Sequence, residues 1–201
     1  MKQPVIGFAG LTHLGLNSAV ASAAKGFSTI GYYNDLELVA HLNEGIPHVT
    51  EPQLPELMEL HRNRLTFSAD LNSLATCDIV YIAVDVPTDG QGKSDLKPIK
   101  EMIEQASGAM DKNALLVILC QVPPGFTRSL SWNEDQLFYQ VETLIFGRAM
   151  ERALYPERFI LGCADPNKPL KPELSNYLEG FNCPLLPMGY ESAELAKISI
   201  N

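Results

Sequence analysis

Two long apolar runs limit what this chain can fold into more than any other feature of its sequence. Residues 78–86 read DIVYIAVDV and residues 115–120 read LLVILC. Near-continuous apolar runs are typical of strands buried on both faces, which occur in parallel sheets covered by helices. Helical and strand patterns alternate along the rest of the chain, as that arrangement requires. We therefore predict an α/β fold with a mostly parallel sheet and helices on both faces.

The remaining elements are predicted from the same periodic patterns. Strands are expected at residues 4–9, 27–32, 66–68, 158–162 and 184–187. Helices are expected at residues 14–25, 35–43, 56–65, 70–75, 99–110 and 169–179, and another begins at residue 192. Residues 131–152 are interpreted as helical or irregular. The chain has 201 residues, which is enough to bury a sizeable core.

The composition argues against several classes of partner. The formal net charge is −9, whereas binding to nucleic acid or to anionic lipid requires a surplus of Lys and Arg, so neither is expected. No apolar run reaches the roughly 18 residues of a membrane-spanning helix. The first residues lack the layout of a signal peptide, which predicts a cytoplasmic protein. The four cysteines form no Cys-x-x-Cys pair, so we expect free, mostly buried thiols and no metal site.

A glycine-containing turn between the first predicted strand and helix indicates what the sheet could bind. Residues 6–15 read IGFAGLTHLG. Gly10 and Gly15 take the first and third positions of the dinucleotide-binding fingerprint, and Thr12 takes the place of the middle glycine. The following helix would present N–H groups and a partial positive charge to a pyrophosphate. The turn alone is equally compatible with a structural connection, but with the alternating elements it predicts a Rossmann-like, doubly wound fold.

The end of the second predicted strand departs from the usual pattern. A dinucleotide without a 2′-phosphate usually meets an acidic residue there, but the position holds Tyr33, and Asp35 follows two residues later. A phenol cannot accept two ribose hydrogen bonds as a carboxylate does, although its ring could stack against the adenine edge. Asp35 is interpreted either as a cofactor ligand or as the cap of the next helix.

Five segments, taken in order, resemble the UDP-glucose/GDP-mannose dehydrogenase family. The turn GLTHLGL at residues 10–16 is similar to the family's opening glycine-rich turn. The segment AVDVPTD at residues 83–89, with the Gly and Asp-Leu that follow it, is similar to the loop after the family's fourth strand. CQVPPG at 120–125 is similar to its Ser-Thr-Val-Pro-x-Gly turn. Residues 142–162, ending in PERFILG, and AELAKISIN at 193–201 resemble its Glu-Phe-Leu…Pro-Asp-Arg-Ile-x-x-Gly stretch and its Glu-Leu-x-Lys-x-x-x-Asn helix.

The resemblance implies NAD-dependent, two-step oxidation of the primary alcohol of a nucleotide sugar, such as UDP-glucose, to the uronic acid. In the family a catalytic cysteine forms covalent intermediates, and hydride leaves twice to the nicotinamide. Glu142 matches the catalytic glutamate that orients the attacking water. Lys197 and Asn201, four residues apart on one helical face, match the pair that stabilises oxyanion charge. Gln121 stands where the family has a threonine near the water and the nicotinamide.

The resemblance also implies which residues contact the cofactor. They are Gly10, Thr12, His13, Leu14, Gly15, Tyr33, Asp35, Val86, Pro87, Thr88 and Gln121. The likeness covers nearly the whole chain but only the N-terminal part of the family. Residues 1–190 would form the NAD-binding domain, and residues 191–201 would begin the central helix through which the full-length protein forms a homodimer.

The family's glycine-rich cysteine motif and its C-terminal substrate domain have no counterpart in these residues. Cys120 ends a strand near the expected cofactor cleft but is interpreted as structural. The chain alone is therefore expected to lack turnover. An ending inside an apolar helix favours a fragment of a longer protein or a shortened paralogue.

Two other interpretations stay open. The residues at Thr12, Tyr33 and Gln121 also fit a degenerate relative that keeps the fold for binding or assembly and no longer uses NAD. A different Rossmann oxidoreductase, such as a hydroxyacid dehydrogenase, is disfavoured by the loop at residues 87–95 and by the stretch at residues 142–162.

Overall fold

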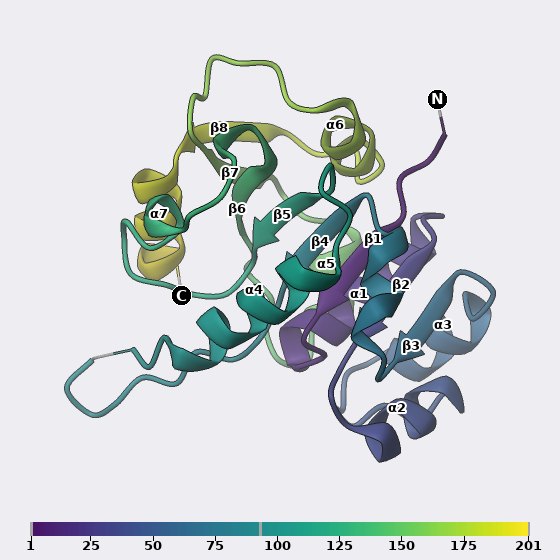
Figure 1. Cartoon of the computed structure of the whole chain (residues 1–201). Helices are drawn as coiled ribbons and strands as arrows, with labels where there is room; N and C mark the ends of the chain where they lie inside the picture. Colours follow the sequence, from purple (N-terminus) through teal and green to yellow (C-terminus); the bar gives the residue numbers. More distant parts are fainter. Residues whose placement is uncertain (1, 93, 201) are drawn as a thin grey trace.

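The computed structural model describes residues 2–92 and 94–200, which form one eight-stranded sheet covered by helices (Figure 1). The strands are β1 (Ile6–Ala9), β2 (Thr29–Tyr32), β3 (Leu65–Ser68), β4 (Ile79–Ile82), β5 (Leu115–Ile118), β6 (Leu137–Val141), β7 (Phe159–Cys163) and β8 (Leu185–Gly189). The α-helices are α1 (His13–Ala24), α2 (Leu36–Asn43), α3 (Leu54–Leu60), α4 (Lys97–Ala109), α5 (Ala149–Leu154), α6 (Pro172–Glu179) and α7 (Tyr190–Ile200). Three short 3₁₀ helices are η1 (Leu71–Thr76), η2 (Thr127–Ser129) and η3 (Glu134–Gln136).

The strand order confirms the predicted doubly wound, mostly parallel sheet. The order is β3-β2-β1-β4-β5-β6-β7-β8, and every neighbouring pair is parallel except the antiparallel pair β6 and β7. Strand β1 is central, since Gly7 pairs with Ile30 of β2 on one side and with Val80 of β4 on the other. The chain therefore winds outward in one direction through β2 and β3 and in the other through β4, β5 and β6.

Each face of the sheet packs against its own helices, as the buried apolar runs predict. On β4, Ile79 and Tyr81 belong to one apolar cluster, and Val80 and Ile82 belong to the other. The first cluster includes buried side chains of α1, α5 and α6, and the second includes those of α4 and α7. Side chains alternate between the two faces of a strand, so β4 is apolar at every position because both faces are covered.

The interpretation of residues 131–152 as helical or irregular is wrong in its middle. These residues contain β6, whose five residues are all buried. A polar residue, Gln140, interrupts the apolar pattern of this strand. Its amide oxygen accepts a buried hydrogen bond from the Tyr81 hydroxyl over 2.9 Å. Strand β4, which β5 separates from β6 in the sheet, supplies that partner, so the local sequence does not indicate a buried strand here.

Most predicted elements differ from the structure by a few residues at one end, and two differ more. The strand predicted at residues 78–86 is β4, which begins at Ile79 and ends at Ile82, and Ala83 and Val84 after it lie next to Gly10 of the turn after β1. The helix predicted at 56–65 is α3, which begins at Leu54 and ends at Leu60. Turn residues follow it, and Leu65 already belongs to β3.

Among the described residues, no helix is both long and apolar enough to cross a lipid bilayer. The four cysteines are free thiols, as predicted. Three of them are buried and Cys183 is partly exposed.

Candidate active site

The candidate site lies at the edge of the sheet where the parallel strands β1, β4, β5 and β6 end. Neighbouring parallel strands point the same way, so the turns that follow them meet at one edge. The chain leaves β1 toward β2 on one side and reaches β4 on the other, which makes the β1–β4 junction the topological switch point. Doubly wound sheets bind ligands in the crevice at that junction.

Two glycines of the turn after β1 are required by the backbone around them. Gly10 has a φ of +103°, and a Cβ there would lie 2.7 Å from the carbonyl oxygen of Ala83. A Cβ on Gly15 would overlap the carbonyl oxygen of Gly10. Only glycine tolerates such a conformation and such close approaches. The turn therefore has the tight bend and the close helix–strand packing expected of a dinucleotide-binding turn.

Thr12 stands at the N-cap position, immediately before α1. Its hydroxyl donates a hydrogen bond of 3.0 Å to the carbonyl oxygen of Ala83, and its side chain makes no capping bond to the first turn of the helix. The hydroxyl is thus directed at the turn after β4. The backbone N–H groups at the start of α1, including those of His13 and Leu14, have no acceptor within the helix, and a phosphate could accept hydrogen bonds from them.

His13 is held at the start of α1 by a carboxylate that sequence reasoning missed. Its Nε2 lies 2.7 Å from Oε1 of Glu51, which is only 4% exposed. The same carboxylate accepts hydrogen bonds from the backbone N–H groups of Gly147 (2.9 Å) and Ala149 (3.1 Å). Burial works to raise the pKa of Glu51, but these donors outweigh it and the pKa is lowered. The Phe146 ring lies over His13 with a centroid distance of 4.2 Å.

Of the two residues after β2 that were assigned to the cofactor, Asp35 has the capping role that was its alternative interpretation. Asp35 caps α2, since its Oδ1 accepts hydrogen bonds of 3.0 Å from the N–H groups of both Glu37 and Leu38. Tyr33 is partly buried against the core, and its N–H donates to the carbonyl oxygen of Ser68 over 3.1 Å. A role for either residue in holding an adenosine remains a prediction.

The loop after β4 extends from the body of the molecule toward α4 (Figure 1). Thr88 forms an isolated antiparallel bridge with Ser94, and the Pro87 carbonyl oxygen accepts a hydrogen bond of 2.7 Å from Asp95. Val86 is partly buried, whereas Pro87 and Thr88 are exposed. On the next strand, Gln121 follows β5 closely and is exposed at the same edge of the sheet.

Glu142, directly after β6, and Lys197, on α7, are brought together in the structure. Lys197, which is 4% exposed, donates a hydrogen bond of 2.6 Å from Nζ to the backbone carbonyl oxygen of Glu142. Burial raises the pKa of the Glu142 carboxyl to about 7, although the Lys197 charge opposes this shift. Burial also lowers the pKa of Lys197, against the effect of Glu142. Asn201, the third predicted member, lies outside the described residues.

Cys120 is close to this edge but is unsuited to nucleophilic chemistry. Its side chain is buried, its Sγ donates to the carbonyl oxygen of Ile82 over 3.2 Å, and burial raises the pKa of the thiol to about 12. The thiolate is the reactive form of cysteine. The prediction that Cys120 is structural therefore agrees with its surroundings.

A cavity of about 570 Å³ opens beside the end of β6. Its walls include Val141 and Thr143, the neighbours of Glu142 in the chain, together with Arg152 and Arg158. Glu142 itself lines a much smaller interior cavity. Cavities of several hundred cubic ångströms at such strand ends are typical ligand sites.

The fold and the site define a dinucleotide-binding protein of the doubly wound class. Residues 4–176 match the UDP-glucose/GDP-mannose dehydrogenase family, NAD binding domain. The chain belongs to that family, which implies NAD as the cofactor. Gly10 and Gly15 give the turn its tight bend, and no side chain caps the start of α1. Both features of the switch point fit the pyrophosphate of such a cofactor.

Comparisons with individual proteins agree with this assignment. The chain is 31% identical over 169 residues to UDP-glucose 6-dehydrogenase from Rickettsia conorii, covering 78% of this chain and 38% of that protein. It superposes on a UDP-glucose dehydrogenase from Pyrobaculum islandicum with a TM-score of 0.86 and 25% identity, covering 98% of this chain and 49% of that one. It shares the fold of a GDP-mannose dehydrogenase from Pseudomonas aeruginosa, with a TM-score of 0.85, 20% identity and coverage of 98% and 49%. The chain thus spans half or less of the length of these relatives.

Proposed function

We propose that this chain is the cofactor-binding part of an NAD-dependent dehydrogenase that oxidises the primary alcohol of a nucleotide sugar, such as UDP-glucose, to the uronic acid. The observation that carries the proposal is the buried pair of Glu142 and Lys197 at the end of β6. This pair stands at the same sheet edge as the glycine turn, and the chain neighbours of Glu142 line the cavity of about 570 Å³ beside the end of β6. A cofactor fold and a buried acid–base pair are two of the parts that such an oxidation needs.

The pair has the properties that the attack of water on a covalent intermediate requires. A carboxyl with a pKa near 7 exchanges a proton readily at neutral pH, so Glu142 can act as a general acid or base on a bound water. The Lys197 ammonium already lies against one carbonyl oxygen. An ammonium held in a site with little water stabilises negative charge on a reacting oxygen far better than one in solution.

The chain's own residues would hold the dinucleotide at the switch point. Backbone amides from Gly10 to Gly15 would face the pyrophosphate, with His13 and Leu14 in the first turn of α1. Tyr33 would lie against the adenosine, and Gln121 would lie near the nicotinamide. Residues 86–88 would also contact the dinucleotide. The bound cofactor supplies the hydride acceptor for both oxidation steps.

The nucleophile and most sugar contacts would come from residues outside this chain, so the chain alone would bind NAD without turnover. In the full-length protein we propose a nucleotide-sugar substrate, a cytoplasmic location and a homodimer that pairs through the helix that begins as α7. Residues 1–190 would then be the cofactor domain, and residues 191–201 the first turns of that helix.

Calorimetric titration with NAD tests the proposal, and Thr12→Gly is the matched variant. The wild-type chain should bind NAD and release it on competition with NADH. Since the Thr12 hydroxyl already donates to Ala83, its side chain chiefly narrows the approach to the turn, and Thr12→Gly should tighten binding by roughly threefold, under 1 kcal/mol.

Absence of both heat and NADH competition at millimolar NAD would instead favour the alternative function, a degenerate paralogue used for binding or assembly. The residues at Thr12, Tyr33 and Gln121 motivate that alternative. Weaker binding by Thr12→Gly would show that the Thr12 hydroxyl contributes directly to the cofactor site.

A further inference from the structure

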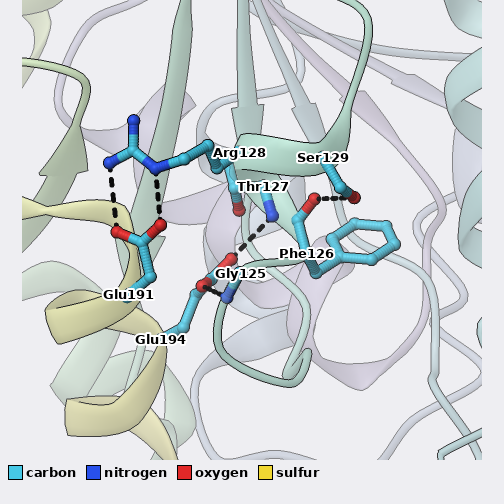
Figure 2. Close-up of polar contacts among 7 residues, drawn as sticks. All are labelled: Gly125, Phe126, Thr127, Arg128, Ser129, Glu191 and Glu194. Carbon is cyan, nitrogen blue, oxygen red and sulfur yellow. Dashed lines mark hydrogen bonds and ion pairs between the residues drawn. The ribbon is translucent and has the colours of Figure 1, made fainter.

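A second carboxylate, on α7, is buried at the site without being part of the acid–base pair. Glu194 has an exposed fraction of 0%. Its two carboxylate oxygens accept hydrogen bonds from the backbone N–H groups of Gly125 (2.6 Å) and Thr127 (2.7 Å), as Figure 2 shows. A buried carboxylate is costly unless donors satisfy it. Here each oxygen has a strong, charge-assisted donor.

Figure 2 also shows a neighbouring contact that makes a natural comparison. Arg128 and Glu191 form a bidentate ion pair at 2.5 and 3.1 Å. Both side chains are nearly half exposed, and exposed pairs typically contribute only about 0–1 kcal/mol. The same turn is thus joined to α7 twice, once by a buried carboxylate and once by a surface ion pair.

The buried contact fixes the helix at the level of the acid–base pair. Glu194 and Lys197 are three residues apart, so they lie on the same side of α7. Glu194 attaches that side to the turn after β5, and Lys197 reaches from it to the carbonyl oxygen of Glu142 at the end of β6. A movement of α7 relative to the turn would therefore move the Lys197 ammonium relative to Glu142.

We propose that Glu194 is a positioning residue. Its carboxylate holds α7 against the turn at residues 125–129 and thereby determines the position of the Lys197 ammonium relative to Glu142. The proposal deepens the proposed function, because it assigns a residue that controls the geometry of the acid–base pair. Glu194 itself would touch neither substrate nor cofactor. In Glu194→Gln, an amide N–H₂ group would replace one carboxylate oxygen and face a backbone N–H group. One of the two hydrogen bonds between Glu194 and the turn would then be lost.

The test follows the Glu142 carboxyl by carbon-13 NMR during a pH titration of the whole chain. Lys197→Met sets the reference, since loss of the opposing charge should raise the titration midpoint of Glu142. Glu194→Gln should raise it in the same direction by about one pH unit. Glu191→Gln, which breaks only the surface pair, should leave the midpoint unchanged.

A Glu194→Gln chain that is less stable yet titrates like the wild type at Glu142 would overturn the proposal and leave Glu194 with a structural role alone. If Glu194→Gln does not fold, Glu194→Asp is judged by the same midpoint. The measurement requires neither NAD binding nor turnover. A failed NAD titration would therefore count against the proposed function while leaving this result interpretable.

Discussion

Two turns at the same sheet edge are built in opposite ways. The turn after β1 is shaped by its own backbone, where Gly10 and Gly15 leave room that any Cβ would fill. The turn after β5 contains Gly125, around which a Cβ would meet nothing within 4 Å. A carboxylate 69 residues away on α7 holds this second turn in place.

The difference teaches where each turn is vulnerable. A turn made by close backbone contacts should fail when a small side chain is added, because neither backbone can move away. A turn held by a distant side chain should tolerate a larger residue and fail when the distant partner is changed. Glu51 is a second carboxylate that holds distant segments together. It joins its own loop to His13 and to the backbone at the start of α5.

The largest expected effect tests the backbone-built turn. Gly15→Ala would place a Cβ where it overlaps the Gly10 carbonyl oxygen, so we expect a loss of about 3 kcal/mol or more in the free energy of unfolding. Gly108→Ala, in α4 with open space around it, is the matched control and should gain about 0.5–1 kcal/mol. Urea unfolding measures both. Equal, small changes would show that the turn after β1 is not sterically closed.

An intermediate effect concerns the acid–base pair that α7 supports. The folded pKa of Glu142, about 7, lies above its ordinary value of 4.5. The folded chain therefore keeps the proton between these values while the unfolded chain loses it, and stability falls as pH rises through this window. Glu142→Gln should remove roughly 1–3 kcal/mol of that pH dependence. Unfolding at pH 5 and pH 8 measures it, and parallel curves for both proteins would contradict the assignment.

The smallest expected effect sharpens the comparison on the other turn. Gly125 has a φ of +91° but no crowded neighbour, so Gly125→Ala should cost only the conformational penalty, about 1–2 kcal/mol. Thermal unfolding beside Gly15→Ala provides the ranking. A loss as large as that of Gly15→Ala would mean that the turn after β5 is closed by its backbone after all.

Much of the fold could be predicted because its signals are local. The runs that become β4 and β5 are apolar at every position, and the glycine spacing after β1 is read directly from neighbouring residues. Strand β6 was missed because Gln140 breaks the apolar pattern, and its buried partner, Tyr81, is supplied by another strand. The resemblance to a family gave Glu142 and Lys197 separate roles, but their contact was not predicted, since nothing local links residues 55 positions apart.

The sequence by itself determined the class of fold and the position of the glycine turn, because hydrophobic periodicity and glycine spacing act over a few residues. The tertiary structure alone decided that Glu51 joins His13 to the start of α5 and that Glu194 holds the turn after β5. The reason is physical. Water competes for the hydrogen bonds of a carboxylate on the surface. The same carboxylate forms strong hydrogen bonds between distant segments only when folding removes that water and brings backbone N–H groups to it.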